Sequence, residues 1–149
     1  MRSEAGRFRD PTSRVFYDGD RVLRGLNDEA ADIDQRARQS GLIDRLVEGG
    51  ALVENWRVDK MATPEGVPSA AVVESRRLPL ISHPGEWSFP MLRDAALLTL
   101  DTNLSALKDG FILKDASAFN VVFDGARPVV LDVASLDPIE DHPTWTAYA

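Results

Sequence analysis

Residues 113 to 132 read Leu113-Lys114-Asp115-Ala116-Ser117-Ala118-Phe119-Asn120-Val121-Val122-Phe123-Asp124-Gly125-Ala126-Arg127-Pro128-Val129-Val130-Leu131-Asp132. Two apolar runs that flank an Asp-Gly turn predict a tight β-hairpin, because glycine adopts positive φ at little steric cost. Asn120 enters one strand of this hairpin and Asp132 leaves the other. We therefore expect both side chains at the same end of the hairpin, next to a loop that contains Asp115.

This loop has the residue types that phosphoryl transfer requires. The reaction needs a carboxylate near the attacking hydroxyl and oxygen ligands for Mg²⁺. Asp115 is the candidate base, Asn120 and Asp132 are the candidate metal ligands, and Lys114 is placed to steady a transferred phosphate. The alternative is structural, because Asp and Asn often hydrogen-bond nearby backbone in turns. The order of loop, hairpin and second aspartate favours the catalytic interpretation, but the structural interpretation stays open.

Composition narrows the class of protein. The chain has 149 residues, 44% of them hydrophobic, which is enough to bury one core. A net charge of −7 argues against a nucleic-acid partner, since such proteins concentrate Lys and Arg on one face. The chain contains no cysteine and no apolar run long enough for a membrane span, and its first residues lack the apolar core typical of a signal peptide. We expect a cytoplasmic protein with no membrane partner.

The remaining chain predicts an α+β fold. Residues 1 to 12 read as a disordered tail, and residues 13 to 149 as the domain. Gly19 marks a hairpin between strands at 13–17 and 21–24. Helices are expected at 28–39, capped by Asn27, and at 42–47, followed by strands at 51–58 and 70–75.

The longest predicted helix begins after Ser88 and ends at Gly110. Its apolar positions keep roughly helical spacing, so we expect it to be a core element. These positions are Met91, Leu92, Ala95, Leu98, Leu100, Leu104 and Leu107.

This order of elements resembles the N-lobe of protein kinases and of aminoglycoside phosphotransferases, continued by a long helix, a catalytic-type loop and a hairpin. The resemblance implies an ATP-like nucleotide with Mg²⁺. The parts that grip the nucleotide depart from the family pattern. Gly19 is the one glycine of the first hairpin, and no lysine precedes Val58, so Arg24 is the nearest substitute.

Two further features lie before the long helix. Glu86-Trp87 is a candidate wall for a bound ligand, although a packed tryptophan that anchors the connector is the favoured interpretation. His83 and His142 lack partners at metal-ligand spacing, so a zinc site is not expected.

Several segments resemble the N-terminal region of bacterial proteins assigned to the class I S-adenosylmethionine-dependent methyltransferases, some described as nodulation-related. These segments are 82–89, 92–98, 113–121 and 127–132. The resemblance implies that a C-terminal methyltransferase domain is a partner of this region. The chain lacks the glycine-rich turn that binds this cofactor, so S-adenosylmethionine is expected only beyond Ala149.

The final residues, 143 to 149, read as the first turn of a helix without the chain to complete it, which predicts a piece of a longer protein. An apolar patch at Trp145 and Tyr148 would favour a homodimer. Three functions remain open: an accessory domain with a degenerate kinase-like site for a small-molecule ligand, an active small-molecule phosphotransferase, or a structural module without a ligand.

Overall fold

The computed structural model describes residues 2–3, 12–59 and 61–141. Most of the expected tail and the expected final helix, with His142, Trp145 and Tyr148, lie outside the described residues. The chain folds into two compact units. Unit 1 comprises residues 1–35 and 54–77, and unit 2 comprises residues 36–53 and 78–149.

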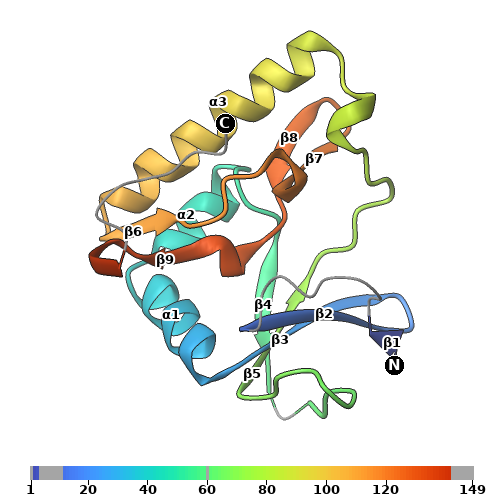
Figure 1. Cartoon of the computed structure of the whole chain (residues 1–149), viewed down its shortest axis with the longest axis vertical. Coiled ribbons are helices and arrows are strands. Elements are labelled where there is room, and N and C mark those ends of the chain that lie inside the picture. Colours follow the sequence, from blue (N-terminus) through green and yellow to red (C-terminus); the bar gives the residue numbers. More distant parts are fainter. Residues whose placement is uncertain (1, 4–11, 60, 142–149) are drawn as a thin grey trace. The chain divides into compact units, whose positions relative to one another are not determined.

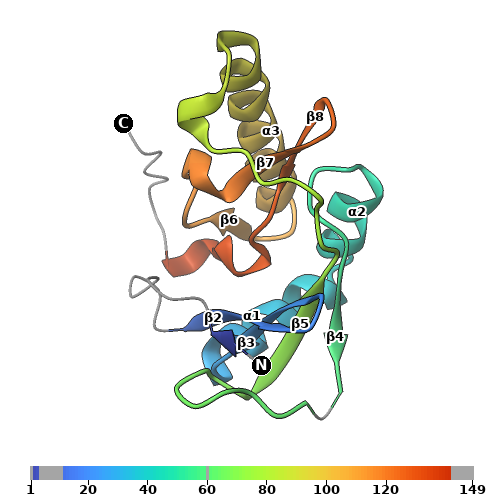
Figure 2. The same ribbon diagram turned by 90° about the vertical axis from the view of Figure 1, so that its right-hand side faces the viewer.

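Unit 1 is built on an antiparallel sheet (Figures 1 and 2). The strands described are β1 (Arg2–Ser3), β2 (Ser13–Asp18), β3 (Arg21–Leu26), β4 (Asn55–Val58) and β5 (Ala71–Ser75), in the order β1-β2-β3-β5-β4. Gly19 has φ 59° in the turn between β2 and β3, which confirms the first hairpin. Phe16, Leu23, Val67 and Val72 form the core of this unit.

Helix α1 (Asp28–Gln39) begins in unit 1 and ends in unit 2. The Asn27 side chain caps it, because Oδ1 accepts a hydrogen bond from the Ala30 N–H at 2.9 Å. Within unit 1, Asp34 of α1 accepts a charge-assisted bond from Arg57 Nε of β4 at 2.6 Å. This part-buried ion pair links the helix to the sheet.

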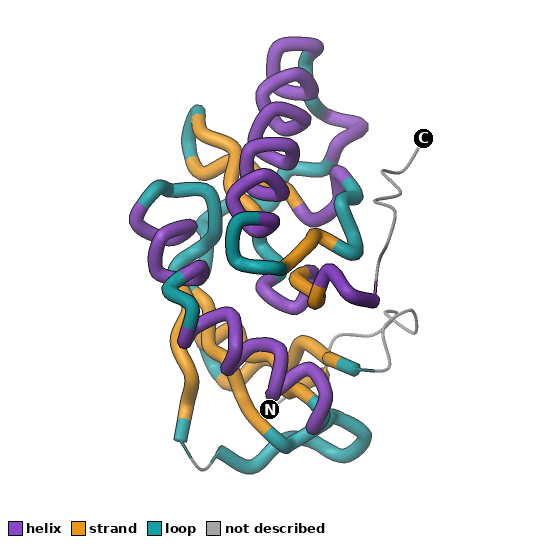
Figure 3. The backbone as a smooth tube through the Cα atoms, turned by 90° about the vertical axis from the view of Figure 1, so that its left-hand side faces the viewer, coloured by secondary structure: helices purple, strands orange, loops and turns teal. Residues whose placement is uncertain are grey.

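Unit 2 contains helix α2 (Leu42–Glu48), the long helix α3 (Phe89–Leu107) and short antiparallel strand pairs (Figures 1 and 3). Strands β7 (Val121–Asp124) and β8 (Arg127–Val130) form the expected hairpin around Gly125, whose φ is 63°. Strands β6 (Phe111–Leu113) and β9 (Leu136–Pro138) form a second pair, which the sequence did not predict. Antiparallel sheets combined with helices confirm the α+β class.

The predicted strand at 51–58 is wrong in its first half. Regular pairing in unit 1 begins only at Asn55. In unit 2, the Val53 N–H donates to the Val130 carbonyl at 2.9 Å, and the Val130 N–H donates to the Ala51 carbonyl at 2.8 Å. The apolar run therefore divides between the units, because its first residues pair with β8 while its last ones join the sheet of β5.

The predicted packing of α3 is also wrong at Leu92, Leu100, Leu104 and Leu107, all of which are exposed. The residues of α3 that are buried are Ala95, Thr102, Asn103 and Ala106. Asn103 Oδ1 accepts a hydrogen bond from the Leu113 N–H at 2.9 Å and so links α3 to β6. Ser88 occupies the N-cap position but makes no side-chain cap bond.

Among the described residues, no helix has the length and apolar character needed to cross a bilayer.

One ion pair of unit 1 predicts how stability changes with pH. Arg21 Nη2 donates a hydrogen bond to Glu74 Oε2 at 2.7 Å. Hydrogen bonding from Arg21 holds the pKa of the Glu74 carboxyl below its ordinary value of 4.5. A lowered folded-state pKa stabilises the fold above the unfolded pKa, and this contribution is lost as pH falls through the folded pKa. We expect the free energy of unfolding to fall on acidification below about 4.5.

Urea unfolding measured from neutral to acid pH would test this expectation. Glu74→Gln should flatten the acid part of the profile, whereas Glu65→Gln, at an exposed loop position of the same unit, should leave it unchanged. Equal profiles for the wild type and Glu74→Gln would contradict it.

Candidate functional site

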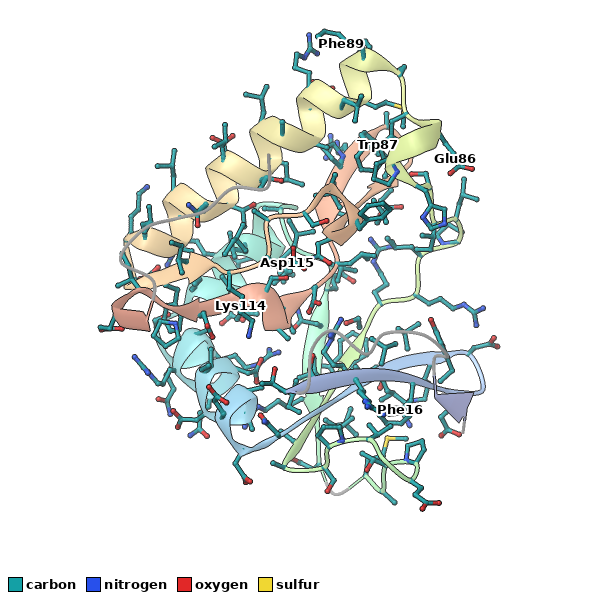
Figure 4. The ribbon with its side chains drawn as sticks, in the orientation of Figure 1. Phe16, Glu86, Trp87, Phe89, Lys114 and Asp115 are labelled. Atoms are coloured by element: carbon teal, nitrogen blue, oxygen red, sulfur yellow. The ribbon has the colours of Figure 1, made fainter. Side chains whose placement is uncertain are left out.

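Six of the eight residues that the sequence singles out belong to unit 2, and the other two belong to unit 1. Lys114 and Asp115 directly follow β6 (Figure 4). Asn120 ends the 3₁₀ turn Ala118–Asn120 and leads into β7, and Asp132 follows β8 and precedes the 3₁₀ turn Val133–Ser135. The expected positions at one end of the β7–β8 hairpin are confirmed for Asn120 and Asp132.

The Asn120 carboxamide is the centre of this region. Its side chain is buried, with 6% exposed. Nδ2 donates to the Asp115 carbonyl oxygen at 3.2 Å and to Ser135 Oγ at 3.3 Å. A carbonyl oxygen only accepts hydrogen bonds, so the amide nitrogen must face Asp115. Both N–H groups are then used, and Oδ1 remains as an oxygen acceptor.

Backbone bonds fix the two halves of the region to each other. The Leu131 N–H donates to the Asn120 carbonyl at 2.8 Å, and the Lys114 N–H donates to the Ser135 carbonyl at 2.8 Å. The Ser135 N–H donates to the Asp132 carbonyl at 3.2 Å. The loop at 114–120 and the turn at 132–135 therefore form one hydrogen-bonded structure within unit 2.

Both carboxylates also shape their own turns. Asp115 Oδ1 accepts from the Ser117 N–H at 3.0 Å, and Asp132 Oδ1 accepts from the Ala134 N–H at 2.9 Å. Each bond joins a side chain to the backbone two residues on, which is the structural role expected of Asp in turns. An ionised carboxylate has about four acceptor sites, so a backbone hydrogen bond and a bound cation are compatible on the same group. The Asp115 side chain is exposed, and that of Asp132 is half-buried.

The Lys114 ammonium lies beside a carboxylate of β9. Its Nζ is 3.6 Å from Asp137 Oδ1, and both side chains are largely buried. Ile112 of β6 is the register partner of Asp137, so the unpredicted β6–β9 pairing brings Asp137 close to Lys114. In this arrangement the Lys114 ammonium pairs with the Asp137 carboxylate and is not an unpaired cation available to a phosphate.

Glu86 and Trp87 precede α3 and have different environments (Figure 4). Glu86 is exposed, and its Oε2 accepts from the His83 N–H at 2.7 Å. Trp87 is 7% exposed, and its ring meets Phe123 edge to face with centroids 5.2 Å apart. Its Nε1 donates to Ser82 Oγ at 3.0 Å. Trp87 therefore packs the connector against β7, as the favoured interpretation of the sequence has it.

Gly19 and Arg24 belong to unit 1. Gly19 forms the exposed β2–β3 turn, and a Cβ built there would meet no atom within 4 Å. Arg24 lies in β3, and its Nη1 donates to Ser13 Oγ of β2 at 2.9 Å. Both positions serve the sheet of unit 1, and their use in ligand binding stays a prediction.

The donor chemistry of the Asn120 region differs from that of an all-protein metal cage. Among the described residues, no group of three or more His, Cys, Asp or Glu side chains gathers to hold an ion. Mg²⁺ sites often use one or two carboxylates, water and substrate phosphate oxygens instead. Asn120 and Asp132 carry side-chain oxygens at one hairpin end, and their use as Mg²⁺ ligands stays a prediction.

Sequence reasoning missed Ser135, whose hydroxyl accepts from the Asn120 amide. Its side chain is 2% exposed, although serine is seldom buried. Ser135 follows Asp132 by three residues, and a polar residue that close to a candidate ligand was the available signal. Its partner could not be read from spacing, because the bond spans 15 residues.

Comparison with known proteins adds one relationship. No family model matches the chain. The chain is similar to nodulation protein NoeA of Rhizobium meliloti (strain 1021), with 39% identity over 142 residues. The alignment covers 95% of this chain but 29% of NoeA, so the chain spans less than a third of the length of this relative. The expected resemblance to nodulation-related bacterial proteins is confirmed at this level.

The Asn120 amide predicts a measurable coupling. Asn120→Ala removes both side-chain bonds, so we expect the free energy of unfolding to fall by about 1–3 kcal/mol. Ser135→Ala removes one of the same bonds, and the double variant should therefore lose less than the sum of the single losses. Urea unfolding of the wild type and the three variants measures this, and strictly additive losses would contradict the bond.

Proposed function

We propose that this chain is a cytoplasmic, kinase-like accessory module of a longer methyltransferase-type protein, and that unit 2 binds nucleotide phosphate through Mg²⁺ held by Asn120 and Asp132. One observation supports the binding part above all. The Asn120 amide donates both of its N–H groups to Asp115 and Ser135, which leaves its oxygen as the group that can meet a cation. The methyltransferase part rests on the sequence resemblance.

Charge explains why a cation belongs in this proposal. The chain has a net charge of −7, so a bare phosphate would be repelled by the protein as a whole. Lys114, the cation of the loop, lies beside Asp137. Mg²⁺ between Asn120, Asp132 and the phosphate oxygens would neutralise both sides, and it binds oxygen ligands by preference.

Thermal unfolding with added nucleotide tests the binding site. We expect ATP with excess Mg²⁺ to raise the melting temperature, because a ligand at about 100 times its Kd stabilises the native state by about 2.7 kcal/mol. Asp132→Asn keeps an acceptor for the Ala134 N–H but loses the charge, and it should abolish the increase. S-adenosylmethionine in place of ATP should leave the melting temperature of this chain unchanged.

Asp32→Asn is the matched control, since Asp32 is an exposed carboxylate of α1. This variant should respond to Mg²⁺ and ATP like the wild type. No increase at millimolar nucleotide, or an equal increase in Asp132→Asn, would overturn the proposed site.

The second candidate function is an active small-molecule phosphotransferase with Asp115 as the base. The observation that favours it is the exposed Asp115 side chain on a backbone held by Asn120. The carboxylate would take the proton of an attacking hydroxyl in this reaction.

Asp115→Asn tests this candidate, because the variant keeps an acceptor for the Ser117 N–H and loses the base. We expect transfer of the ATP γ-phosphoryl group to fall at least 100-fold, given that general-base catalysis contributes about 10²–10⁴. The melting temperature should stay close to that of the wild type. Wild-type transfer by the variant would exclude Asp115 as the base, and absence of both binding and transfer would leave the structural role.

A further inference from the structure

Helix α3 carries a row of exposed leucines that the described residues of unit 2 do not cover. The exposed fractions are 52% for Leu97, 45% for Leu100, 58% for Leu104 and 36% for Leu107. We call these four residues the leucine row. Figure 1 shows α3 along the edge of unit 2, with β6 and the β7–β8 hairpin on one side of it.

The opposite face of α3 makes the contacts with unit 2. It buries Ala95, Thr102, Asn103 and Ala106, which are small or polar side chains. Asn103 is needed there because its Oδ1 accepts the bond from the Leu113 N–H. The usual arrangement of an amphipathic helix is reversed, and exposing contiguous leucines to water is unfavourable unless another surface covers them.

The spacing of the leucine row identifies the kind of surface that fits it. Successive leucines are separated by three, four and three residues. This is the spacing of the a and d positions of a heptad, and it forms a narrow seam that packs against another helix. A partner that offers a second seam of the same kind would complete the packing.

The charges beside the row select the partner and its direction. Asp94, Asp101 and Lys108 recur every seven residues along one flank of the row, so two carboxylates lie toward its start and an ammonium lies at its end. In a parallel pair of α3 helices, this flank would face the opposite flank of the second copy, where Ala96 and Asn103 carry no charge, so no ion pair would form. In an antiparallel pair, Asp94 of one copy, which also pairs with Arg93 of its own helix at 2.8 Å, faces Lys108 of the other, and the same contact repeats at the far end.

We propose that the leucine row is the contact surface between two copies of this chain, with their α3 helices antiparallel about a two-fold axis. Leu97 then packs against Leu107 of the second copy, and Leu100 packs against its Leu104. Such an isologous contact closes on itself, so assembly stops at the dimer. The proposal is independent of nucleotide binding and of the methyltransferase assignment.

Two features limit the strength of this dimer. Helix α3 has 19 residues, so it is about 28 Å long and roughly 10 Å wide. A contact along one face of such a helix buries less than the roughly 800 Å² per partner of a standard interface. Asp101 also lies near the two-fold axis, where it approaches Asp101 of the other copy. We therefore expect association that depends on protein concentration and becomes tighter in Asp101→Asn.

Sedimentation equilibrium over a range of loading concentrations tests the association. The weight-average mass should rise from 16.4 kDa toward twice this value. Leu104→Glu should hold the mass at that of one chain at every concentration. Leu80→Glu is the matched control, because Leu80 is 70% exposed but lies outside α3, and it should associate like the wild type.

Cross-linking tests the direction, and the absence of native cysteine makes engineered thiols unambiguous. A short bis-maleimide should cross-link two chains of the double variant Asp94→Cys/Lys108→Cys. It should not cross-link either single variant, because position 94 faces position 108 in the antiparallel pair. Circular dichroism of each variant shows whether α3 is retained.

Three results would overturn the proposal. The first is a single-chain mass for the wild type at all concentrations, as expected if another segment of polypeptide covers the row. The second is cross-linking of the single variants, which would contradict the antiparallel contact. The third is growth beyond two chains that Leu104→Glu does not prevent.

Discussion

Unit 2 depends on the carboxamide of Asn120. Its two N–H groups join the end of β6, through the Asp115 carbonyl, to the turn after β8, through Ser135. The group is buried, so moving either partner away would leave a donor unsatisfied, at a cost of about 1–3 kcal/mol. Because the constraint acts on the backbone of Asp115, it holds the candidate base without using its carboxylate. The Asp115 carboxylate has a separate structural role, because its Oδ1 accepts a hydrogen bond from the Ser117 N–H.

The two faces of helix α3 have different roles. Its inner face buries Thr102 and Asn103 together with two alanines, and its outer face exposes leucines. Such a helix cannot be turned to bury its leucines, because the Leu113 N–H would then lose its partner at Asn103. The inward face of α3 therefore combines one buried hydrogen bond with small-residue packing.

Local chemistry accounts for what the sequence predicted correctly. Gly19 and Gly125 mark both hairpins, and Asn27 marks the start of α1, because turns and caps depend on a few adjacent residues. The β6–β9 pair joins residues more than twenty positions apart and lacks a turn signal, so neither the pair nor the Lys114–Asp137 contact was predictable. Periodicity likewise located the apolar stripe of α3 but could not say which side faces unit 2. The order of Asp115, Asn120 and Asp132 was readable, whereas their connection through Ser135 was not.

The chain passes between its units at 35–36, 53–54 and 77–78, so each unit is assembled from separate stretches of sequence. During synthesis, α2 leaves the ribosome before α3, β7 and β8 have been made. Its apolar residues cannot be buried against these elements until later. The sheet of unit 1 is complete once residue 77 has emerged, and it can fold first. Unit 1 would then hold both ends of the α2 segment while the rest of unit 2 is made. Holding both ends of the α2 segment shortens the loop that must close when α2 packs into unit 2. The entropic cost of that closure is therefore lower.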